Sequence, residues 1–208
     1  MNSYLANDSV VIHIKNMAYE LISKEDIRLR GPHNLYNVMA SALVALSLGI
    51  SKEKCQQVFK QFSGLEHRLE QVATIAGVEY YNDSKCTTVD ALKYSLQSFD
   101  KPIVLIAGGK DKGGRFVDLR SIVEKKVKVA ILIGEAADRI FSEWGGATLI
   151  HKADSLEKAM EMAKIETDEG DVVLLSPACS SFDMFDNYEN RGEVFKEIVK
   201  KFKVKSHE

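Results

Sequence analysis

Apolar and polar positions alternate along the chain in two ways, and the change falls near residue 64. Residues 102–107, 129–134 and 172–176 are apolar almost throughout, which is typical of strands buried on both faces of a sheet. Amphipathic stretches separate them, so the sequence predicts an α/β domain with a parallel or mixed, doubly wound sheet. We expect strands at 71–75, 78–81, 102–107, 129–134, 148–150 and 172–176, and helices at 89–99, 119–126, 136–143, 155–164 and 191–202.

The pattern before residue 64 is less regular. Residues 10–14 and a run ending at 27–29 predict short strands, and we expect neither a complete sheet nor a covering layer from them. An Ala/Leu-rich stretch within residues 31–49 predicts a buried helix, and residues 52–62 predict a second helix. The sequence therefore predicts two parts, residues 1–63 and residues 64–208, of which the first belongs to something larger.

Composition excludes several classes of protein. The 28 basic and 30 acidic residues leave a net charge of −2, which argues against a nucleic-acid or membrane-surface protein. No signal-peptide pattern and no run of 18 apolar residues occurs. The three cysteines form no C-x-x-C pair, so we expect neither a zinc site nor a disulfide framework. A cytoplasmic location fits these features best.

The most informative stretch is the turn at residues 82–88, Asn-Asp-Ser-Lys-Cys-Thr-Thr, between a predicted strand and a predicted helix. Helix N-termini offer unpaired N–H groups to anions at such strand ends. Asp83, Lys85 and Thr87 would suit a polyanionic ligand, with the lysine for charge and the hydroxyl for geometry. The alternative is a capped turn with Lys85 in solvent.

Two more loops follow predicted strands, at residues 108–114 and 177–188, and we expect all three loops to converge at one edge of the sheet. Neither G-x-x-x-x-G-K-[ST] nor G-x-G-x-x-G occurs, so a P-loop and a dinucleotide fingerprint are absent. The third loop is rich in small and hydroxyl residues, which leaves backbone N–H groups accessible to a carboxylate or phosphate. Cys179 lacks an obvious paired base, so a nucleophilic role is disfavoured.

Five motifs occur in a fixed order: Gly-Pro-His-Asn-x-x-Asn at 31–37, Gly-Leu-x-His-Arg at 64–68, Asn-Asp-Ser-Lys-x-Thr at 82–87, Gly-Gly-x-x-Lys at 108–112 and Ser-Pro-Ala-Cys-x-Ser-Phe-Asp-x-Phe at 176–185. Together they resemble the Mur ligases of peptidoglycan synthesis, over about residues 31–202. The resemblance is strongest to members that add D-glutamate to UDP-N-acetylmuramoyl-L-alanine. Cys86, Thr88 and Ser180 depart from the family pattern only beside motif residues.

The resemblance implies ATP-dependent amide formation through an acyl phosphate, in cell-wall biogenesis. It also implies three domains, of which residues 1–63 would be the C-terminal remnant of the central ATP-binding domain and residues 64–208 the Rossmann-like C-terminal domain. The P-loop and the Mg²⁺ ligands would lie upstream, in missing N-terminal and central domains. We therefore expect no metal ligands here and no activity from this chain alone.

The resemblance also implies residue roles. The catalytic residues would be Lys85, which would approach the transferring phosphate, and His67, which would lie alongside the ribose or phosphates. Ser181, together with backbone N–H groups near Phe182 and Tyr188, would hold the side-chain carboxylate of D-glutamate. The remaining roles are adenine contacts for Asn34 and Asn37, ribose or phosphate contacts for Arg68 and Asp83, and the α-carboxylate of D-glutamate for Thr87 and Lys112.

From the residues alone, structural alternatives without a ligand stay open. Asn34 and Asn37 could be an N-cap and a solvated residue, and Arg68 could lie in a solvent-exposed bend. The 108–114 loop could be a solvated lysine-rich turn. For the whole chain, the alternative is a stand-alone α/β module that binds an amino acid or nucleotide without catalysis. A dinucleotide-dependent dehydrogenase is disfavoured by the missing glycine fingerprint.

Overall fold

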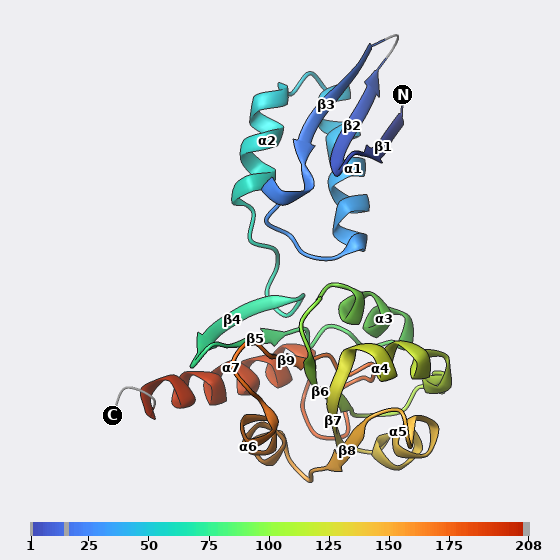
Figure 1. The fold of residues 1–208 in the computed structure, drawn as a ribbon, viewed down its shortest axis with the longest axis vertical. Coiled ribbons are helices and arrows are strands. Elements are labelled where there is room, and N and C mark those ends of the chain that lie inside the picture. Colours follow the sequence, from blue (N-terminus) through green and yellow to red (C-terminus); the bar gives the residue numbers. More distant parts are fainter. Residues whose placement is uncertain (1, 15–16, 206–208) are drawn as a thin grey trace. The chain divides into compact units, whose positions relative to one another are not determined.

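A computed structural model describes residues 2–14 and 17–205 of the chain (Figure 1). The chain divides into two compact units, and the division falls between Gly64 and Leu65. Each unit has its own hydrophobic core and is described by itself. Within the described ranges, no helix is long and apolar enough to cross a membrane.

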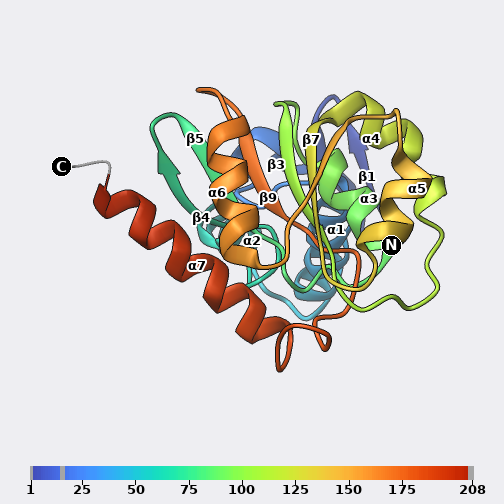
Figure 2. The same ribbon diagram turned by 90° about the horizontal axis from the view of Figure 1, so that it is seen from below.

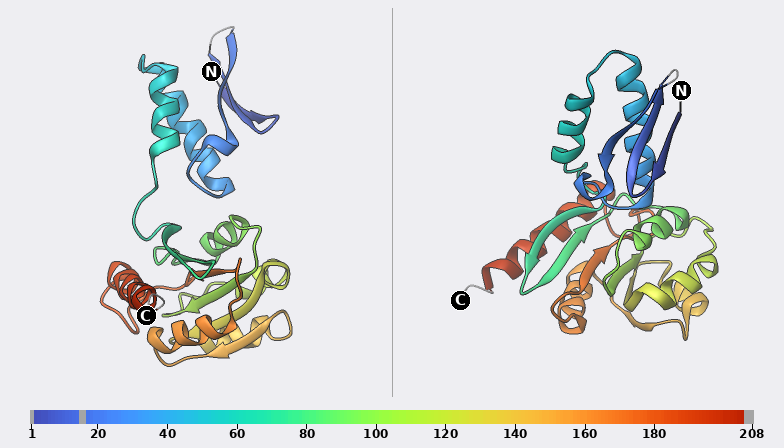
Figure 3. Two further views of the ribbon diagram at one scale, coloured as in Figure 1. Left: turned by 60° about the vertical axis from the view of Figure 1, so that its left-hand side comes forward. Right: turned by 45° about the horizontal axis from the view of Figure 1, so that its top comes forward.

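The first unit is a three-stranded antiparallel sheet covered by two helices (Figure 3, left). Its strands are β1 (Asn2–Ala6), β2 (Ser9–Ile14) and β3 (Met17–Ser23), with β2 in the middle. The expectation of an incomplete, uncovered set of strands was wrong, because α1 (Pro32–Ser47) and α2 (Lys52–Gln61) pack on the sheet. The buried residues of this core are Val10, Ile12, Leu21, Ile22, Ile27, Val38, Ala42 and Cys55.

The predicted strand ending at residues 27–29 was also wrong. The strand ends at Ser23, whose hydroxyl accepts a hydrogen bond from the N–H of Glu25 and so caps the short 3₁₀-helix η1 (Lys24–Asp26). Ile27 is buried in the core without joining the sheet, so its apolar character reflects packing and not strand pairing.

Helices α1 and α2 lie close to their predicted positions because both carry local start signals. Pro32 occupies the first turn of α1, where its missing N–H costs nothing. The hydroxyl of Ser51 accepts a hydrogen bond from the N–H of Lys54 at the start of α2. Cys55 is buried between helix and sheet, as its place on the apolar face predicts.

The second unit contains a six-stranded sheet with the order β4-β5-β9-β6-β7-β8. Only β4, at the edge, runs antiparallel to its neighbour, and the other pairs are parallel. This arrangement confirms the predicted α/β class. The strands are β4 (Glu70–Ile75), β5 (Val78–Asn82), β6 (Ile103–Gly108), β7 (Val127–Ile133), β8 (Leu149–Lys152) and β9 (Val172–Leu175).

Helices cover both faces of this sheet, which confirms the doubly wound prediction. Alternate residues of β6 enter opposite cores: Leu105 faces the core under α3, α4 and α5, whereas Ile106 faces the core under α6 and α7. Figure 2 shows α6 and α7 lying beside each other. The helices are α3 (Val89–Gln97), α4 (Arg120–Lys126), preceded by the 3₁₀-helix η2 (Phe116–Leu119), α5 (Ala137–Trp144), α6 (Leu156–Glu166) and α7 (Tyr188–Lys205).

The last strand of the sheet, β9, lies between the first two parallel strands, β5 and β6. The carboxyl ends of β5, β9 and β6 are consequently neighbours, although their loops are far apart in the sequence. Helix α7 begins at Tyr188, three residues before its predicted start at Arg191. This longer helix brings its first turn directly to the loops at that edge.

Candidate functional site

The three loops at the carboxyl edge of the sheet are joined by backbone hydrogen bonds, as predicted from the strand pattern. The N–H of Asp83 donates to the carbonyl of Leu175 (2.8 Å), and the N–H of Gly108 donates to the carbonyl of Pro177 (2.9 Å). The N–H of Lys110 donates to the carbonyl of Ser180 (2.9 Å). Gly109 has a φ of 129°, and a Cβ there would lie 2.4 Å from the carbonyl oxygen of Ser180, so the two loops approach closely only because this residue is glycine.

The carboxylate of Asp83 is buried beneath these loops. Its Oδ2 accepts hydrogen bonds from the hydroxyls of Ser95 (2.5 Å) and Ser176 (2.7 Å), and its Oδ1 accepts one from the N–H of Leu69 (3.1 Å). Burial raises the pKa of Asp83 to about 6, and the hydrogen bonds and Arg68 lower it only in part. Both oxygens are thus engaged within the chain, so the nucleotide contact implied for Asp83, which stays a prediction, would share one of them.

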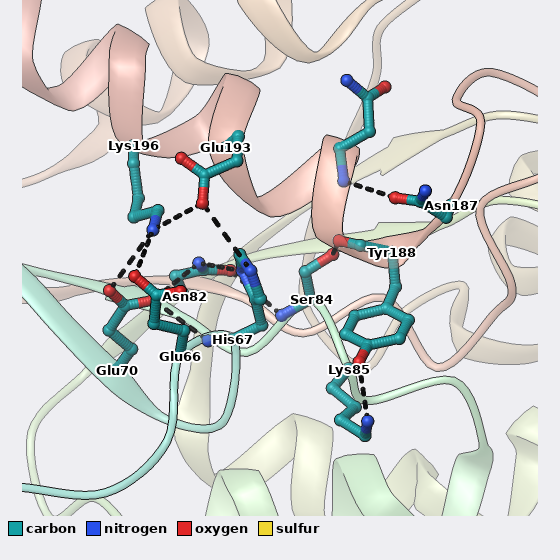
Figure 4. A network of polar contacts seen from close by, with 11 residues as sticks. Glu66, His67, Glu70, Asn82, Ser84, Lys85, Asn187, Tyr188, Glu193 and Lys196 are labelled. Carbon is teal, nitrogen blue, oxygen red and sulfur yellow. Dashed lines mark hydrogen bonds and ion pairs between the residues drawn. The ribbon is translucent and has the colours of Figure 1, made fainter.

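Lys85 follows in the same turn and contacts the start of α7. Its ammonium Nζ donates to the hydroxyl of Tyr188 at 2.7 Å and lies 4.4 Å from the centre of that ring. The hydroxyl of Ser84 donates to the backbone carbonyl of Tyr188 at 2.8 Å. The 82–88 turn and the first residue of α7 are therefore connected at two points (Figure 4).

Arg191, one turn into α7, is almost fully buried and binds both loops. Its guanidinium donates to the hydroxyl and carbonyl of Ser84 (2.9 and 2.8 Å) and to the carbonyls of Cys179 (3.2 Å) and Ser180 (3.4 Å). Burial lowers its pKa to about 10, which leaves the guanidinium charged near neutral pH. A buried charge is tolerated here because it donates to several carbonyl oxygens.

His67 is a buried residue with left-handed backbone geometry, at a φ of 63°. The N–H of Ser84 donates to the Asn82 Oδ1 (3.1 Å), so the Asn82 Nδ2 is the amide donor, and it lies 2.9 Å from Nδ1 of His67 and from Oε2 of Glu70. Nδ1 of His67 accordingly accepts, and its proton is placed on Nε2. These contacts enclose the ring, and the catalytic role implied for His67 stays a prediction.

Two carboxylates, those of Glu66 and Glu193, gather near the ring of His67 (Figure 4). Glu66, His67 and Glu193 could each offer one ligand atom to a metal ion. However, the ammonium of Lys196 lies 2.7 Å from Glu193 and 3.3 Å from Glu66. This lysine supplies the compensating positive charge, so the cluster is a salt-bridge network around the histidine.

Arg139 of α5 holds the part of the loop that carries Lys112. The guanidinium of Arg139 donates to the carboxylate of Asp111 (2.7 Å), to the carbonyl of Gly114 and to the carboxylate of Glu143 (3.0 Å). The hydrogen bond from Arg139 holds the pKa of Asp111 below its ordinary value. These contacts bracket Lys112, whose own side chain is exposed and available to a ligand.

The other residues predicted for the site occupy varied environments. Ser181 is buried, and its carbonyl accepts hydrogen bonds from two following N–H groups, which makes a tight turn. Phe182, next in that turn, is 69% exposed. Thr87 is half-buried beside the start of α3, and Arg68 is exposed.

Asn34 and Asn37 belong to the first unit and share one face of α1, as their spacing predicts. The amide of Asn37 donates to Oδ1 of Asn34 (3.2 Å), and the amide of Asn34 donates to the carbonyl of Arg30 (2.6 Å). These two amides form a candidate site within the first unit. Their predicted contact with adenine remains a prediction.

All three cysteines are buried, which disfavours a nucleophilic role. Burial raises the pKa of Cys86 and of Cys179 to about 12, in both cases with help from a nearby carboxylate. Burial also raises the pKa of Cys55. Thiols that stay protonated at neutral pH do not attack a substrate, which agrees with the disfavoured role of Cys179.

Comparison with known proteins identifies the class. A family profile described as "Mur ligase, glutamate ligase domain" matches residues 67–179, more than half of the chain. The chain therefore belongs to the Mur ligase family. Two solved structures share its fold: a pseudomurein peptide ligase type C from Methanothermus fervidus (TM-score 0.69, 17% identity, 96% of this chain and 41% of that one) and the MurC ligase of Thermotoga maritima (TM-score 0.67, 14% identity, 96% and 45%).

Curated relatives are much more similar in sequence. The UDP-N-acetylmuramoylalanine–D-glutamate ligase of Aquifex aeolicus is 47% identical over 197 residues, which cover 94% of this chain and 46% of that protein. The enzyme of the same name from Salinibacter ruber is 43% identical over 191 residues, which cover 91% and 42%. The chain thus spans less than half the length of these relatives.

Several residues that organise the site escaped the sequence analysis. Ser84 lies in the predicted 82–88 turn, Arg139 in the predicted helix at 136–143 and Arg191 at the start of the predicted helix at 191–202, but none of the three was singled out. Arg191 contacts Ser84 across 107 positions of sequence, and no local pattern reveals such a contact. The only signal was the neighbouring Gly192, a helix-weakening residue within an otherwise helical stretch.

Proposed function

We propose that this chain forms the glutamate-binding and nucleotide-closing part of an ATP-dependent ligase that adds D-glutamate to UDP-N-acetylmuramoyl-L-alanine. The observation that carries the proposal is the joining of the 82–88, 108–114 and 177–188 loops at one sheet edge, in a chain that is 47% identical to an enzyme of that name. Such a ligase belongs to peptidoglycan synthesis, and the reaction takes place in the cytoplasm.

The acceptor half of the proposed site has the chemistry that a dicarboxylate needs. Lys112 offers an exposed ammonium from a loop that Arg139 holds in place, and Thr87 offers a hydroxyl from the 82–88 turn. The hydroxyl of Ser181 and backbone N–H groups near Phe182 and Tyr188 would suit the second carboxylate. Thr87 and Lys112 would bind the α-carboxylate of D-glutamate, and Ser181 with Phe182 and Tyr188 its side-chain carboxylate.

The nucleotide half uses different residues. Asn34 and Asn37 present paired amides suited to adenine, and Arg68 presents an exposed guanidinium suited to phosphate. In the proposed reaction, ATP phosphorylates the carboxylate of the muramoyl substrate, the amine of D-glutamate attacks the acyl phosphate, and phosphate leaves. Lys85 would stabilise charge on that phosphate. His67, whose backbone carbonyl accepts a hydrogen bond from the N–H of Lys85 at 3.0 Å, would be the second catalytic residue.

The proposal assigns no metal ligand to these residues. A Mg²⁺ ion that accompanies ATP would be held by other regions of the enzyme, since Lys196 already neutralises the acidic cluster at His67. The P-loop would likewise come from regions that the longer relatives contain. We assign residues 1–63 to the end of their central domain and residues 64–208 to their C-terminal domain.

Phosphate release tests the proposal. A protein that joins this chain to the preceding regions of the ligase should release phosphate only when ATP, UDP-N-acetylmuramoyl-L-alanine and D-glutamate are all present, and L-glutamate should not replace the D-isomer. The 208-residue chain alone should release none. Phosphate release by the 208-residue chain alone would contradict the proposal that other regions of the ligase are required. If phosphate release by the longer protein did not depend on D-glutamate, a non-catalytic binding module would be favoured.

Lys112→Ala sharpens this test. Loss of a charge-assisted contact to a carboxylate should raise the KM for D-glutamate about tenfold or more and leave the KM for ATP nearly unchanged. Lys110→Ala is a matched control, because Lys110 belongs to the same loop but pairs with Glu135 at 3.7 Å. An unchanged KM in Lys112→Ala would remove this residue from the acceptor site.

A further inference from the structure

The hydroxyl of Tyr188 accepts a hydrogen bond from the Lys85 ammonium at 2.7 Å. Lysine is a donor only, so the oxygen of Tyr188 must be the acceptor in this contact.

Tyr188 itself is rigidly placed. It is the first residue of α7, and its backbone carbonyl accepts a hydrogen bond from the buried hydroxyl of Ser84 at 2.8 Å. Its ring stands edge-on to His67, with 5.9 Å between ring centres and an interplanar angle of 82°. His67 is enclosed by Asn82 and Gly192, so the ring of Tyr188 packs against a side chain that is itself held in place.

Lys85, by contrast, needs such a partner. Its ammonium sits at the end of four rotatable methylene groups, and an unrestrained lysine side chain samples many rotamers. The hydroxyl of Tyr188 and the face of its ring contact the ammonium together. A lysine held in advance loses less entropy when it meets a phosphate, and it contributes more to the transition state.

We infer that the Tyr188 hydroxyl is a positioning group that holds Lys85 ready for the transferring phosphate. Tyr188 would then serve both halves of the site, through its backbone toward the D-glutamate carboxylate and through its hydroxyl toward the phosphate. The inference rests on the proposed function, because it takes from it the role of Lys85. It adds a link between acceptor binding and phosphate stabilisation through one residue.

Removal of one oxygen tests this link. In the longer ligase, Tyr188→Phe keeps the ring and the backbone contacts and removes only the hydroxyl. We expect kcat to fall about tenfold, the cost of one hydrogen bond to a charged group, while the KM for D-glutamate changes by less than about twofold. Tyr81→Phe is the matched control, because it removes a hydroxyl bound to the Glu79 carboxylate at 2.9 Å, away from the site.

A double-mutant cycle separates positioning from a general structural effect. In a Lys85→Ala background, Tyr188→Phe should cost almost nothing further in kcat, because the group that it positions is gone. The same tenfold loss in that background would overturn the inference, as would an unchanged kcat in Tyr188→Phe alone. Failure of the unaltered ligase to use D-glutamate would instead count against the proposed function.

A readout without turnover completes the test. Acetic anhydride labels accessible lysines, and mass spectrometry measures the extent at each position. Lys85 should be labelled faster in Tyr188→Phe than in the unaltered protein or in Tyr81→Phe, because its ammonium has lost an anchoring partner. Equal labelling of Lys85 in all three proteins would overturn the inference.

Discussion

His67 and Gly192 are in such close contact that the histidine ring occupies the space of a side chain on α7. A Cβ built at Gly192 would lie 2.2 Å from Nδ1 of His67 and 2.8 Å from its Cε1. His67 reaches this place only through a left-handed backbone, with a φ of 63°. The histidine and the helix therefore fit together as one unit, with the Glu193 carboxylate 3.7 Å from Nε2 on the other side of the ring.

Gly192→Ala should consequently destabilise the protein, although alanine is the better helix former by about 1 kcal/mol. The added methyl group must displace the buried ring of His67, and we expect a net loss of about 1–3 kcal/mol in the free energy of unfolding. Urea denaturation followed by the fluorescence of Trp144, the only tryptophan, measures it. Asn190→Ala, at an exposed position of the same helix, should change stability by less than about 0.5 kcal/mol. Equal stability of the two variants would contradict the close fit.

Asp83 should make stability depend on pH in an unusual direction. Its pKa rises from 3.8 to about 6 in the folded state, so folding favours the protonated carboxyl. Stability from this group is then fully present below about pH 4 and is lost as pH rises through about 6. Relative to Asp83→Asn, the unaltered protein should lose about 1–3 kcal/mol of unfolding free energy between pH 4 and pH 7. Urea denaturation at several pH values measures this difference, and parallel pH profiles would show that Asp83 ionises freely.

Arg139 should lower the KM for D-glutamate without contacting this substrate. Arg139→Gln removes the ion pair with Asp111 and loosens the loop on both sides of Lys112. In the longer ligase we expect a rise of about tenfold in the KM for D-glutamate and a KM for ATP within about twofold of normal. Steady-state kinetics with each substrate varied in turn supply both values. Arg115→Gln is the control, since Arg115 is exposed and pairs with Asp118 on the same segment, and a similar effect of both variants would rule out a specific anchor.

The three thiols should not react with thiol reagents until the protein unfolds. All three cysteines are buried, and burial raises the pKa of Cys86 and Cys179 to about 12. Ellman's reagent at pH 8 should therefore react with all three only after denaturant is added. Fast release of thionitrobenzoate from the native protein would show that at least one thiol is accessible and ionised.

Much of the second unit follows from local sequence patterns. The apolar runs gave the parallel strands, and the Gly- and Ser-rich turns gave the loops that meet at the sheet edge. The first unit was harder, because β1 (Asn2–Ala6) has the polar and apolar mixture of an edge strand and no continuous apolar run. The burial of Asp83 against Ser95 and Ser176 was also invisible, since a turn containing Asn, Asp and Ser predicts exposed caps equally well.

Long-range contacts account for the remaining differences. Arg191 binds Ser84, and Tyr188 binds Lys85, across more than 100 residues in each case. Periodicity describes which face of a helix is apolar, and it says nothing about which loop lies opposite that face. The sequence therefore indicated which loops meet at the edge of the sheet, whereas the buried groups that hold those loops came only from the structure.

The position of β9 in the sheet has a consequence for folding during synthesis on the ribosome. The strands β6, β7 and β8 can pair as they emerge, and so can the hairpin of β4 and β5, but these two pieces share no ladder until β9 lies between them. Residues 172–175 are made after the other five strands of this sheet, and α7 is made later still. Until β9 is made, the nascent chain should expose the open edges of β5 and β6 to chaperones. A premature stop before residue 172 would leave loops 82–88 and 108–114 intact in sequence and never adjacent.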